Sequence, residues 1–208
     1  MRVRKLVVGE LETNCYIVTD DEGDAVIIDP GGDAQRIERV IEDEELTPTC
    51  ILCTHGHPDH IFAAGLLQET FSVDLRIHEL DAVLVARGVG EMEFLFDMQA
   101  FRNPVLGDSI SDGETVRVGE IGLKVIQTPG HTPGSVCFLC GQDLFAGDTL
   151  FAGGVGRTDL VGGSETALVK SIQARLLVMD DEVRVHPGHG PETTIGDEKR
   201  SNPWLRQN

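Results

Sequence analysis

Several features are absent from this sequence, and each absence excludes a class of protein. No run of about 18 apolar residues occurs, which argues against a transmembrane helix and a membrane partner. The segment Met1–Glu10 has no apolar stretch ending in small residues, so we expect no secretory signal and a cytoplasmic location. No low-complexity segment or Pro/Ser-rich linker divides the chain, and we expect a single domain over residues 1–208.

Basic residues are also scarce, since 17 Lys and Arg stand against 35 Asp and Glu, for a formal net charge of −18. This charge would repel a polyanion, so no nucleic acid partner is expected. Hydrophobic residues make up 40% of the chain, as in ordinary globular proteins that bury a core without disulfides. A small-molecule substrate is the partner that we expect, and the sequence does not indicate the oligomeric state.

The five cysteines include two C-x-x-C pairs, Cys50/Cys53 and Cys137/Cys140, a spacing that also occurs in zinc sites. Both pairs lie in apolar runs typical of strands, in which residues three apart point to opposite faces. We therefore predict buried free thiols, which suit a reducing compartment, in place of a metal site.

Apolar periodicity predicts strands first and then strands alternating with helices. The predicted strands are Cys15–Thr19, Ala25–Ile28, Thr49–Cys53, Val73–Ile77, Thr115–Val118, Leu123–Thr128, Ser135–Leu139, Leu144–Ala146 and Glu182–Val185. The predicted helices are Ala34–Glu45 with Asp33 as its cap, Asp59–Thr70, Glu79–Ala86, and Glu165–Met179 with Ser164 as its cap. Mixed strands with helices between them indicate a layered α/β structure.

The strongest motif is His55-Gly56-His57-Pro58-Asp59-His60, in which four potential metal ligands occupy six positions. Histidine is the commonest metal-binding side chain, and carboxylates suit the same divalent ions. His55 and His57 alternate along an extended turn, whereas Asp59 and His60 stand where a helix is expected to begin. Since the whole chain has only seven histidines, this concentration predicts a metal site better than it fits a chance polar turn.

Three further turns each place one potential ligand after an apolar strand, namely His131, Asp148 and His189. Strand ends of α/β sheets are where sites are assembled, because rigid strands position residues on short loops. We therefore expect these three residues beside the histidine-rich segment.

Three other polar residues are interpreted differently. Asp29, which precedes Pro30, is either a hydrogen-bond partner that fixes the tautomer of a ligand histidine or a turn-forming residue. His186 is interpreted as a strand-end residue or a partner of a ligand, and His78 as a surface or packing residue.

In this order and spacing the motifs resemble the metallo-β-lactamase superfamily. The residues that match its metal ligands are His55, His57, Asp59, His60, His131, Asp148 and His189. Residues 147–151, 156–159 and 189–194 are similar to the short glyoxalase II-like (hydroxyacylglutathione hydrolase-like) branch. The resemblance covers nearly the whole chain, and it implies an αββα sandwich of two mixed β-sheets flanked by helices.

The resemblance also implies a division of the ligands between two divalent metal ions. His55, His57 and His131 would hold one ion, Asp59, His60 and His189 the other, and Asp148 would bridge both. Zinc is expected, although iron and manganese suit the same donors. A metal-bridging hydroxide would attack the substrate carbonyl with Asp59 and Asp148 as catalytic carboxylates. The implied function is hydrolysis of thioesters such as S-D-lactoylglutathione.

Full-length glyoxalase II enzymes carry a C-terminal helical domain that binds glutathione, and only 19 residues follow His189 here, so this domain is not expected. Arg157 matches a basic residue near the substrate in the family. It would contact a substrate carboxylate or form a structural ion pair with Asp159. The aromatic residues Phe94, Phe96 and Phe101 are interpreted as core packing in preference to a substrate pocket.

Other functions fit the same motifs. A persulfide dioxygenase of this superfamily would use one iron held by His55, His131 and Asp148, but the turn at His189 favours a complete second site. A lactonase or β-lactamase would use the same hydrolytic chemistry. The charge of −18 disfavours a nuclease, and the presence of all seven ligands disfavours a binding module without activity.

Overall fold

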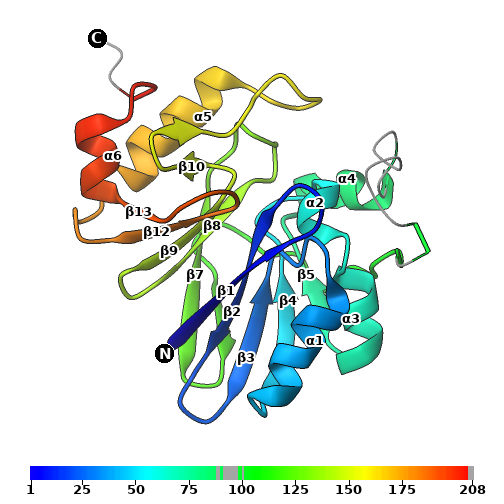
Figure 1. Ribbon diagram of the computed structural model, residues 1–208. Coiled ribbons are helices and arrows are strands. Elements are labelled where there is room, and N and C mark those ends of the chain that lie inside the picture. The colour runs from blue at the N-terminus through cyan, green and yellow to red at the C-terminus, as the bar shows by residue number, and fades with distance from the viewer. Residues whose placement is uncertain (88–89, 91–97, 100, 206–208) are drawn as a thin grey trace.

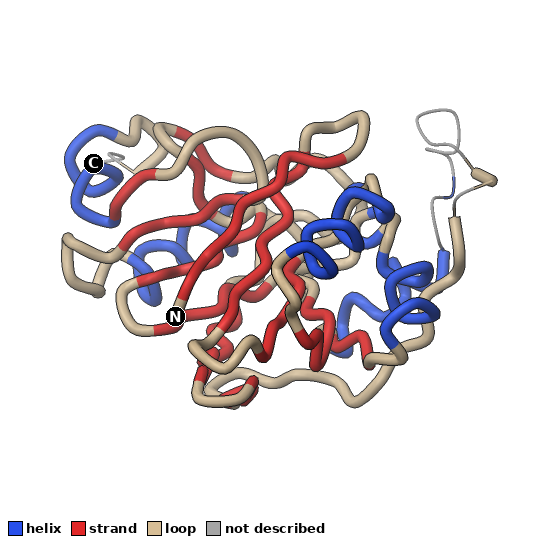
Figure 2. The backbone as a smooth tube through the Cα atoms, turned by 60° about the horizontal axis from the view of Figure 1, so that its bottom comes forward, coloured by secondary structure: helices blue, strands red, loops and turns tan. Residues whose placement is uncertain are grey.

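Two β-sheets pack face to face, and helices cover the outer face of each sheet (Figures 1 and 2). This computed structural model describes residues 1–87, 90, 98–99 and 101–205. Both sheets contain parallel and antiparallel neighbours. The αββα sandwich with two mixed sheets, which the sequence resemblance implied, is therefore confirmed.

The first sheet comes from the N-terminal part of the chain and has the order β1-β2-β3-β4-β5. Its strands are β1 (Arg2–Val8), β2 (Thr13–Thr19), β3 (Asp24–Ile28), β4 (Thr47–Leu52) and β5 (Asp74–Arg76). Helices α1 (Ala34–Asp43) and α3 (Ala64–Phe71) cover its outer face, where Ile37 and Leu67 join a buried cluster with Ile27 and Ile51. A short helix α2 (Pro58–Ile61) follows β4, and a 3-10 turn, Glu79–Asp81, leads into α4 (Ala82–Arg87).

The second sheet has the order β13-β12-β9-β8-β7-β6. Its strands are β6 (Thr115–Val118), β7 (Ile121–Gln127), β8 (Val136–Cys140), β9 (Asp143–Gly147), β12 (Arg184–Pro187) and β13 (Thr193–Thr194). Helix α5 (Glu165–Ser171), the π-helical turn Ile172–Leu176 and α6 (Ile195–Ser201) accompany it, and β10 (Leu150–Phe151) pairs with β11 (Gly154–Val155). Leu168 and Ile172 pack with Leu144 and Val185 in a second buried cluster.

Alternating side chains of the strands divide between the core and the outer layers. Cys50 lies in the cluster between the sheets, whereas Cys53 lies in the cluster beneath the helices of the first sheet. Cys137 and Cys140 likewise belong to different clusters. All five cysteines are free, and burial raises the pKa of the Cys137 thiol to about 11. The predicted separation of each C-x-x-C pair across its strand is confirmed.

Three local predictions are wrong, and tertiary contacts explain two of them. The helix predicted over Asp59–Thr70 is two helices, because the amide of Ala63 donates to the Pro30 carbonyl at 2.9 Å instead of continuing the turn. The helix predicted over Glu165–Met179 changes to a π-helical turn after Ser171 and ends at Leu176. Asp33 is not a side-chain cap, since its Oδ2 accepts from the Gly9 amide.

Two further expectations concern the membrane and the aromatic segment. Within the described ranges, no helix is both long and apolar enough to cross a membrane. Phe94 and Phe96 lie outside the described residues. The ring of Phe101 is partly buried and packs on Phe62, which lines a cavity, with centroids 5.3 Å apart.

Candidate metal centre

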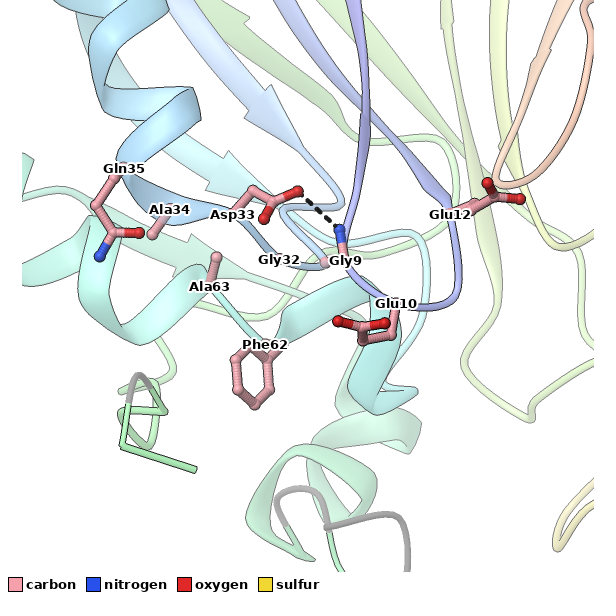
Figure 3. Close-up of a pocket in the computed structure, with 10 residues that line it drawn as sticks. Gly9, Glu10, Glu12, Gly32, Asp33, Ala34, Gln35, Phe62 and Ala63 are labelled. Carbon is pink, nitrogen blue, oxygen red and sulfur yellow. Dashed lines mark hydrogen bonds between the residues drawn. The ribbon is translucent and has the colours of Figure 1, made fainter. Parts of the chain in front are cut away.

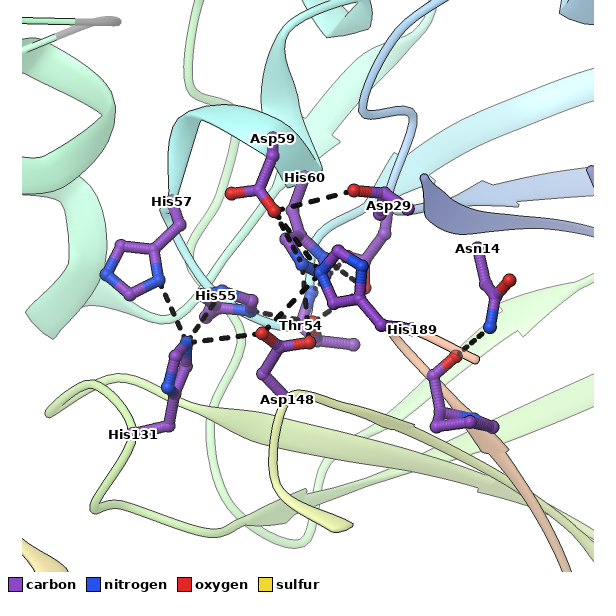
Figure 4. A network of polar contacts seen from close by, with 12 residues as sticks. Asn14, Asp29, Thr54, His55, His57, Asp59, His60, His131, Asp148 and His189 are labelled. Carbon is purple, nitrogen blue, oxygen red and sulfur yellow. Dashed lines mark hydrogen bonds and ion pairs between the residues drawn. The ribbon is translucent and has the colours of Figure 1, made fainter. Parts of the chain in front are cut away.

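All seven predicted ligands meet at one edge of the sandwich, where strands of both sheets end (Figure 4). The turn after β4 carries His55 and His57, and α2 carries Asp59 and His60. The second sheet contributes the other three from the turns after β7, β9 and β12, which carry His131, Asp148 and His189. The sequence motifs therefore predicted a true spatial cluster.

One group consists of His55, His57 and His131. Nδ1 of His57 lies 2.9 Å from Nε2 of His131, and Nε2 of His131 lies 3.2 Å from Nε2 of His55. Four ligands at about 2.05 Å around a tetrahedral zinc ion would lie about 3.3 Å from one another. The three ring nitrogens are therefore spaced closely enough to share one ion, and we call them the imidazole group.

The other group consists of Asp59, His60 and His189, and we call it the mixed group. Oδ2 of Asp59 lies 3.3 Å from Nε2 of His189 and 3.6 Å from Nε2 of His60. The Thr13 hydroxyl donates to the same Asp59 oxygen at 3.5 Å. This set offers one carboxylate and two imidazoles, which are common ligands of zinc and of iron.

Asp148 lies between the two groups. Its Oδ2 is 3.6 Å from Nε2 of His131 in the imidazole group and 3.7 Å from Nε2 of His189 in the mixed group. Its Oδ1 is 3.4 Å from Nε2 of His60. A single carboxylate therefore reaches both positions, as a bridging ligand must.

Hydrogen bonds on the outer side of the histidines assign their tautomers. Nδ1 of His131 donates to the Arg157 carbonyl at 2.7 Å, and Nδ1 of His60 donates to Oδ2 of Asp29 at 3.0 Å. Thr54 donates its hydroxyl proton to Asp29, so that hydroxyl accepts from Nδ1 of His55 at 3.1 Å. In all three rings the unprotonated Nε2 consequently faces the centre, which is the arrangement of metal-bound histidines.

The donor set fits divalent ions because its polar atoms lack other partners. Among the described residues, the buried side-chain atoms without a hydrogen-bond partner are Nε2 of His60 and Oδ1 of Asp148. Buried polar groups are almost always satisfied, so two such atoms side by side need a partner that protein hydrogen bonds do not supply. A cation at each position would supply it and would separate the facing lone pairs of His55 and His131.

The two groups differ in their electrostatics. Burial, assisted by the neighbouring His60 and His131, lowers the pKa of His55 well below its usual value, and burial with His131 lowers the pKa of His57 to about 4. Burial also opposes charge on His60, but Asp148, Asp59 and Asp29 together raise its pKa well above the usual value. Burial thus favours the neutral, metal-binding form of His55 and His57, whereas the carboxylates around His60 favour positive charge at that position, which a bound metal ion would also supply.

Asp81 is a supporting residue that the sequence analysis missed. It is fully buried and accepts from the Gly56 amide at 2.9 Å, the Thr132 hydroxyl at 2.7 Å and the Gly134 amide at 2.7 Å. These donors belong to the two turns that carry the imidazole group. No local pattern marked Asp81, which stands among ordinary helix-forming residues.

Asn14 and Tyr16 on β2 were missed as well, and they support the turn of His189. The side-chain amide of Asn14 donates to the carbonyls of Pro187 at 2.9 Å and Gly190 at 3.0 Å. The Tyr16 hydroxyl donates to the Pro187 carbonyl at 2.7 Å. These bonds join the first sheet to the ligand turn of the second.

Of the three other polar residues considered in the sequence, one contacts the centre and two do not. Asp29 contacts His60 and Thr54, so the partner interpretation describes its position better than a turn-forming role alone. His186 lies in β12 and contacts Asp143 at 2.7 Å and Glu192 at 3.1 Å, apart from the seven ligands. His78 is buried and its Nδ1 accepts from the Leu80 amide, so its surface interpretation is wrong and its packing interpretation holds.

Arg157 contacts the metal centre through its backbone carbonyl. Its carbonyl holds His131, while its exposed guanidinium pairs with both carboxylate oxygens of Asp159 at 2.8 and 2.7 Å. The structural ion pair, which was one of the two interpretations from sequence, is therefore present.

A cavity of about 470 Å³ lies beside the first turn of α1 (Figure 3). It is bounded by the β1–β2 turn and by Phe62 and Ala63, and Glu10, Glu12 and Asp33 bring carboxylates to its wall. The dashed contact in Figure 3 is the bond from the Gly9 amide to Asp33 that replaces the predicted cap.

Comparisons with known proteins agree with this geometry. A family model described as the metallo-beta-lactamase superfamily matches residues 8–191. The chain is 37% identical to "Hydroxyacylglutathione hydrolase GloC" of Haemophilus influenzae over 219 residues, an alignment that covers 99% of this chain and 98% of the relative.

Solved structures agree as well. The crystal structure of TTHA1623 in a di-iron-bound form has a TM-score of 0.87 at 37% identity, and the match covers 97% of this chain and all of the other. The crystal structure of BLEG-1 B3 metallo-beta-lactamase has a TM-score of 0.83 at 35% identity, over 99% of this chain and all of the other. With its ligand motifs gathered at one edge of an αββα sandwich, the chain belongs to the metallo-β-lactamase superfamily and is a metal-dependent hydrolase of that superfamily with a His/Asp metal site.

Proposed function

We propose that this protein is a binuclear hydrolase of thioesters such as S-D-lactoylglutathione. The observation that carries the proposal is the position of Asp148, which reaches His131 in the imidazole group and both His60 and His189 in the mixed group. A carboxylate placed between two complete donor sets suits two ions better than one.

Two divalent ions held there would supply an activated water at neutral pH and a Lewis acid that polarises the carbonyl of the ester. The chain's own part is to hold the ions and to orient the water. Burial opposes charge on Asp59, but His60 and His189 lower the pKa of its carboxyl group, so the carboxylate stays ionised and could orient that water as a hydrogen-bond acceptor. Asp148 fixes the separation of the two positions.

The cysteines offer no competing nucleophile. Cys15, Cys50, Cys53 and Cys137 are buried, Cys140 is partly buried, and burial raises the pKa of each thiol. The reactive thiolate is therefore disfavoured at all five positions. Attack by an activated water, rather than formation of a covalent intermediate on the protein, is the chemistry that the site supports.

The glutathione thioester is favoured by one relative. GloC of Haemophilus influenzae, whose name states hydroxyacylglutathione hydrolase, aligns with this chain over 98% of its own length. A relative with that name thus has no large segment beyond those it shares with this chain. This supports hydroxyacylglutathione as a substrate without the helical domain of full-length glyoxalase II enzymes.

The identity of the metal ion is a separate part of the proposal. Zinc is our expected metal, although the related TTHA1623 structure is a di-iron-bound form. That di-iron form supports a two-ion site over the mononuclear iron centre of a persulfide dioxygenase. Mixed His and Asp donors accept zinc, iron or manganese according to supply, so the metal should be measured and not assumed.

The test is kcat/KM for S-D-lactoylglutathione, measured at neutral pH on protein whose zinc, iron and manganese contents are known. We expect two ions per chain and a value above about 10⁴ M⁻¹s⁻¹, the low end of the usual range for enzymes. Glutathione persulfide with an oxygen electrode, a lactone and a β-lactam serve as alternative substrates. Turnover of one of these with no turnover of the thioester would overturn the substrate, and a single bound iron with oxygen uptake would overturn the hydrolase.

A further inference from the structure

Asp81 joins the two turns that carry the imidazole group. One carboxylate oxygen accepts from the Gly134 amide, and the other accepts from the Gly56 amide and the Thr132 hydroxyl. Gly56 lies between His55 and His57, and Thr132 directly follows His131. A fully buried side chain thus spans the turn from the first sheet and the turn from the second.

Two glycines, Gly56 and Gly134, allow the ligand turns to lie close to Asp81. A Cβ atom on Gly134 would lie 2.6 Å from Oδ1 of Asp81, and one on Gly56 would lie 2.9 Å from the Asp81 carbonyl oxygen. His78 orients the start of the 3-10 turn, since its carbonyl accepts from the Asp81 amide at 3.0 Å. Asp81 therefore has a fixed position from which any shift would move both ligand turns.

We propose that Asp81 is a positioning residue that sets the affinity of the imidazole group for its ion while leaving the mixed group unchanged. The proposal rests on the proposed function, because it takes His55, His57 and His131 as ligands of one ion. A carboxylate that accepts three hydrogen bonds from two turns holds three ring nitrogens at a spacing that one ion can use. Residues that hydrogen-bond to metal ligands typically change the affinity for the ion by about 10–100-fold when mutated. We expect the same range for Asp81, because it holds both ligand turns through three buried hydrogen bonds.

Asp29 provides a matched comparison on the other side of the centre. It is also buried, and it also accepts three hydrogen bonds, from the Thr54 amide and hydroxyl and from His60. Its direct ligand contact is in the mixed group. If each aspartate acts mainly on the group that it contacts, then Asp81→Asn and Asp29→Asn should weaken different ions although both remove a buried carboxylate.

The experiment is a cobalt(II) titration of metal-free protein, followed by visible absorption, in backgrounds that keep one group each. His189→Ala damages the mixed group and His57→Ala damages the imidazole group. We expect Asp81→Asn to weaken the remaining ion by about 10–100-fold in the His189→Ala background and by less than about threefold in the His57→Ala background. Asp29→Asn should show the larger effect in the His57→Ala background.

If Asp81→Asn reduced the affinity for cobalt(II) equally in both backgrounds, Asp81 would act only on general stability, and the proposal would be overturned. Thr132→Val, which removes one of the three donors at similar volume, gives a milder test if Asp81→Asn does not fold. Thr132→Val should reduce the affinity for cobalt(II) by a smaller factor with the same dependence on background. An unchanged affinity would count against the proposal. A wild-type chain that binds fewer than two cobalt ions would instead overturn the assignment of two metal positions and the role of Asp81 with it.

Discussion

The two ligand groups lie next to each other, but the chain supports them by different means. In the imidazole group, His55 and His131 are 1% and 2% exposed, and Asp81 ties their turns together from within the protein. In the mixed group, the side chain of His189 is 29% exposed, and backbone bonds across the sheets hold its turn, such as that from the Asn14 amide to the Gly188 carbonyl at 2.7 Å.

This difference indicates which side of the centre is more exposed to solvent. In the imidazole group only His57 is partly exposed, whereas in the mixed group both His189 and Asp59, whose side chain is 13% exposed, are partly exposed and only His60 is fully buried. We therefore expect the ion held by the mixed group to exchange faster with the solvent. The following changes test how far the two groups behave as separate units.

Replacing Asp148 should have the largest effect, because this residue contacts both groups. We expect Asp148→Ala to lose tight binding of a pair of ions and several kcal/mol of transition-state stabilisation. That loss corresponds to a fall in kcat/KM of about 10³-fold or more. Metal analysis and thioester turnover would measure it, and a variant with two ions and full turnover would exclude the bridging role.

Replacing Tyr16 by Phe should have an intermediate effect that is confined to the mixed group. The change removes one buried hydrogen bond to the Pro187 carbonyl, which keeps its bond from Asn14, so unfolding should become easier by about 1 kcal/mol. Chemical denaturation measures this loss. Because Tyr16 acts through the turn of His189, affinity for one ion should fall by less than the 10–100-fold typical of direct ligand partners. A fall for both ions would contradict the separation of the two groups.

Replacing Arg157 by Ala should have the smallest effect on either group. Its carbonyl, which accepts a hydrogen bond from His131, is retained, and its guanidinium forms an exposed ion pair with Asp159. Metal content and thermal midpoint should therefore match the wild type. The value of KM for the thioester is the decisive measurement, since a large rise with unchanged kcat would assign the guanidinium to the substrate instead of to the surface ion pair.

The sequence sufficed to locate the seven residues of the cluster, because histidine is rare in this chain and stands in short turns after apolar strands. The layered fold followed from the same periodicity and from the family resemblance. The ends of the helices were harder to predict from the sequence. The break after Ile61 depends on a bond from Ala63 to Pro30, a contact between distant segments that periodicity does not report.

The supporting residues were missed for a related physical reason. Asp81 and Thr132 are 51 residues apart, and Tyr16 and Pro187 are 171 apart, so their bonds leave no local pattern. Helix α6 is different, because Thr194 stands three residues before Asp197 and caps the helix by accepting from its amide at 3.1 Å. This was a readable start signal, and α6 could have been predicted.

The convergence of turns from both sheets also bears on the order of folding. His57 and His131, whose ring nitrogens are 2.9 Å apart, are separated by 74 residues. Closing such a loop is entropically unfavourable until the strands on either side have paired and the sheets have docked. No partly folded chain with separate sheets can present either complete donor set, so we expect metal uptake to mark the final step of folding and not to nucleate it.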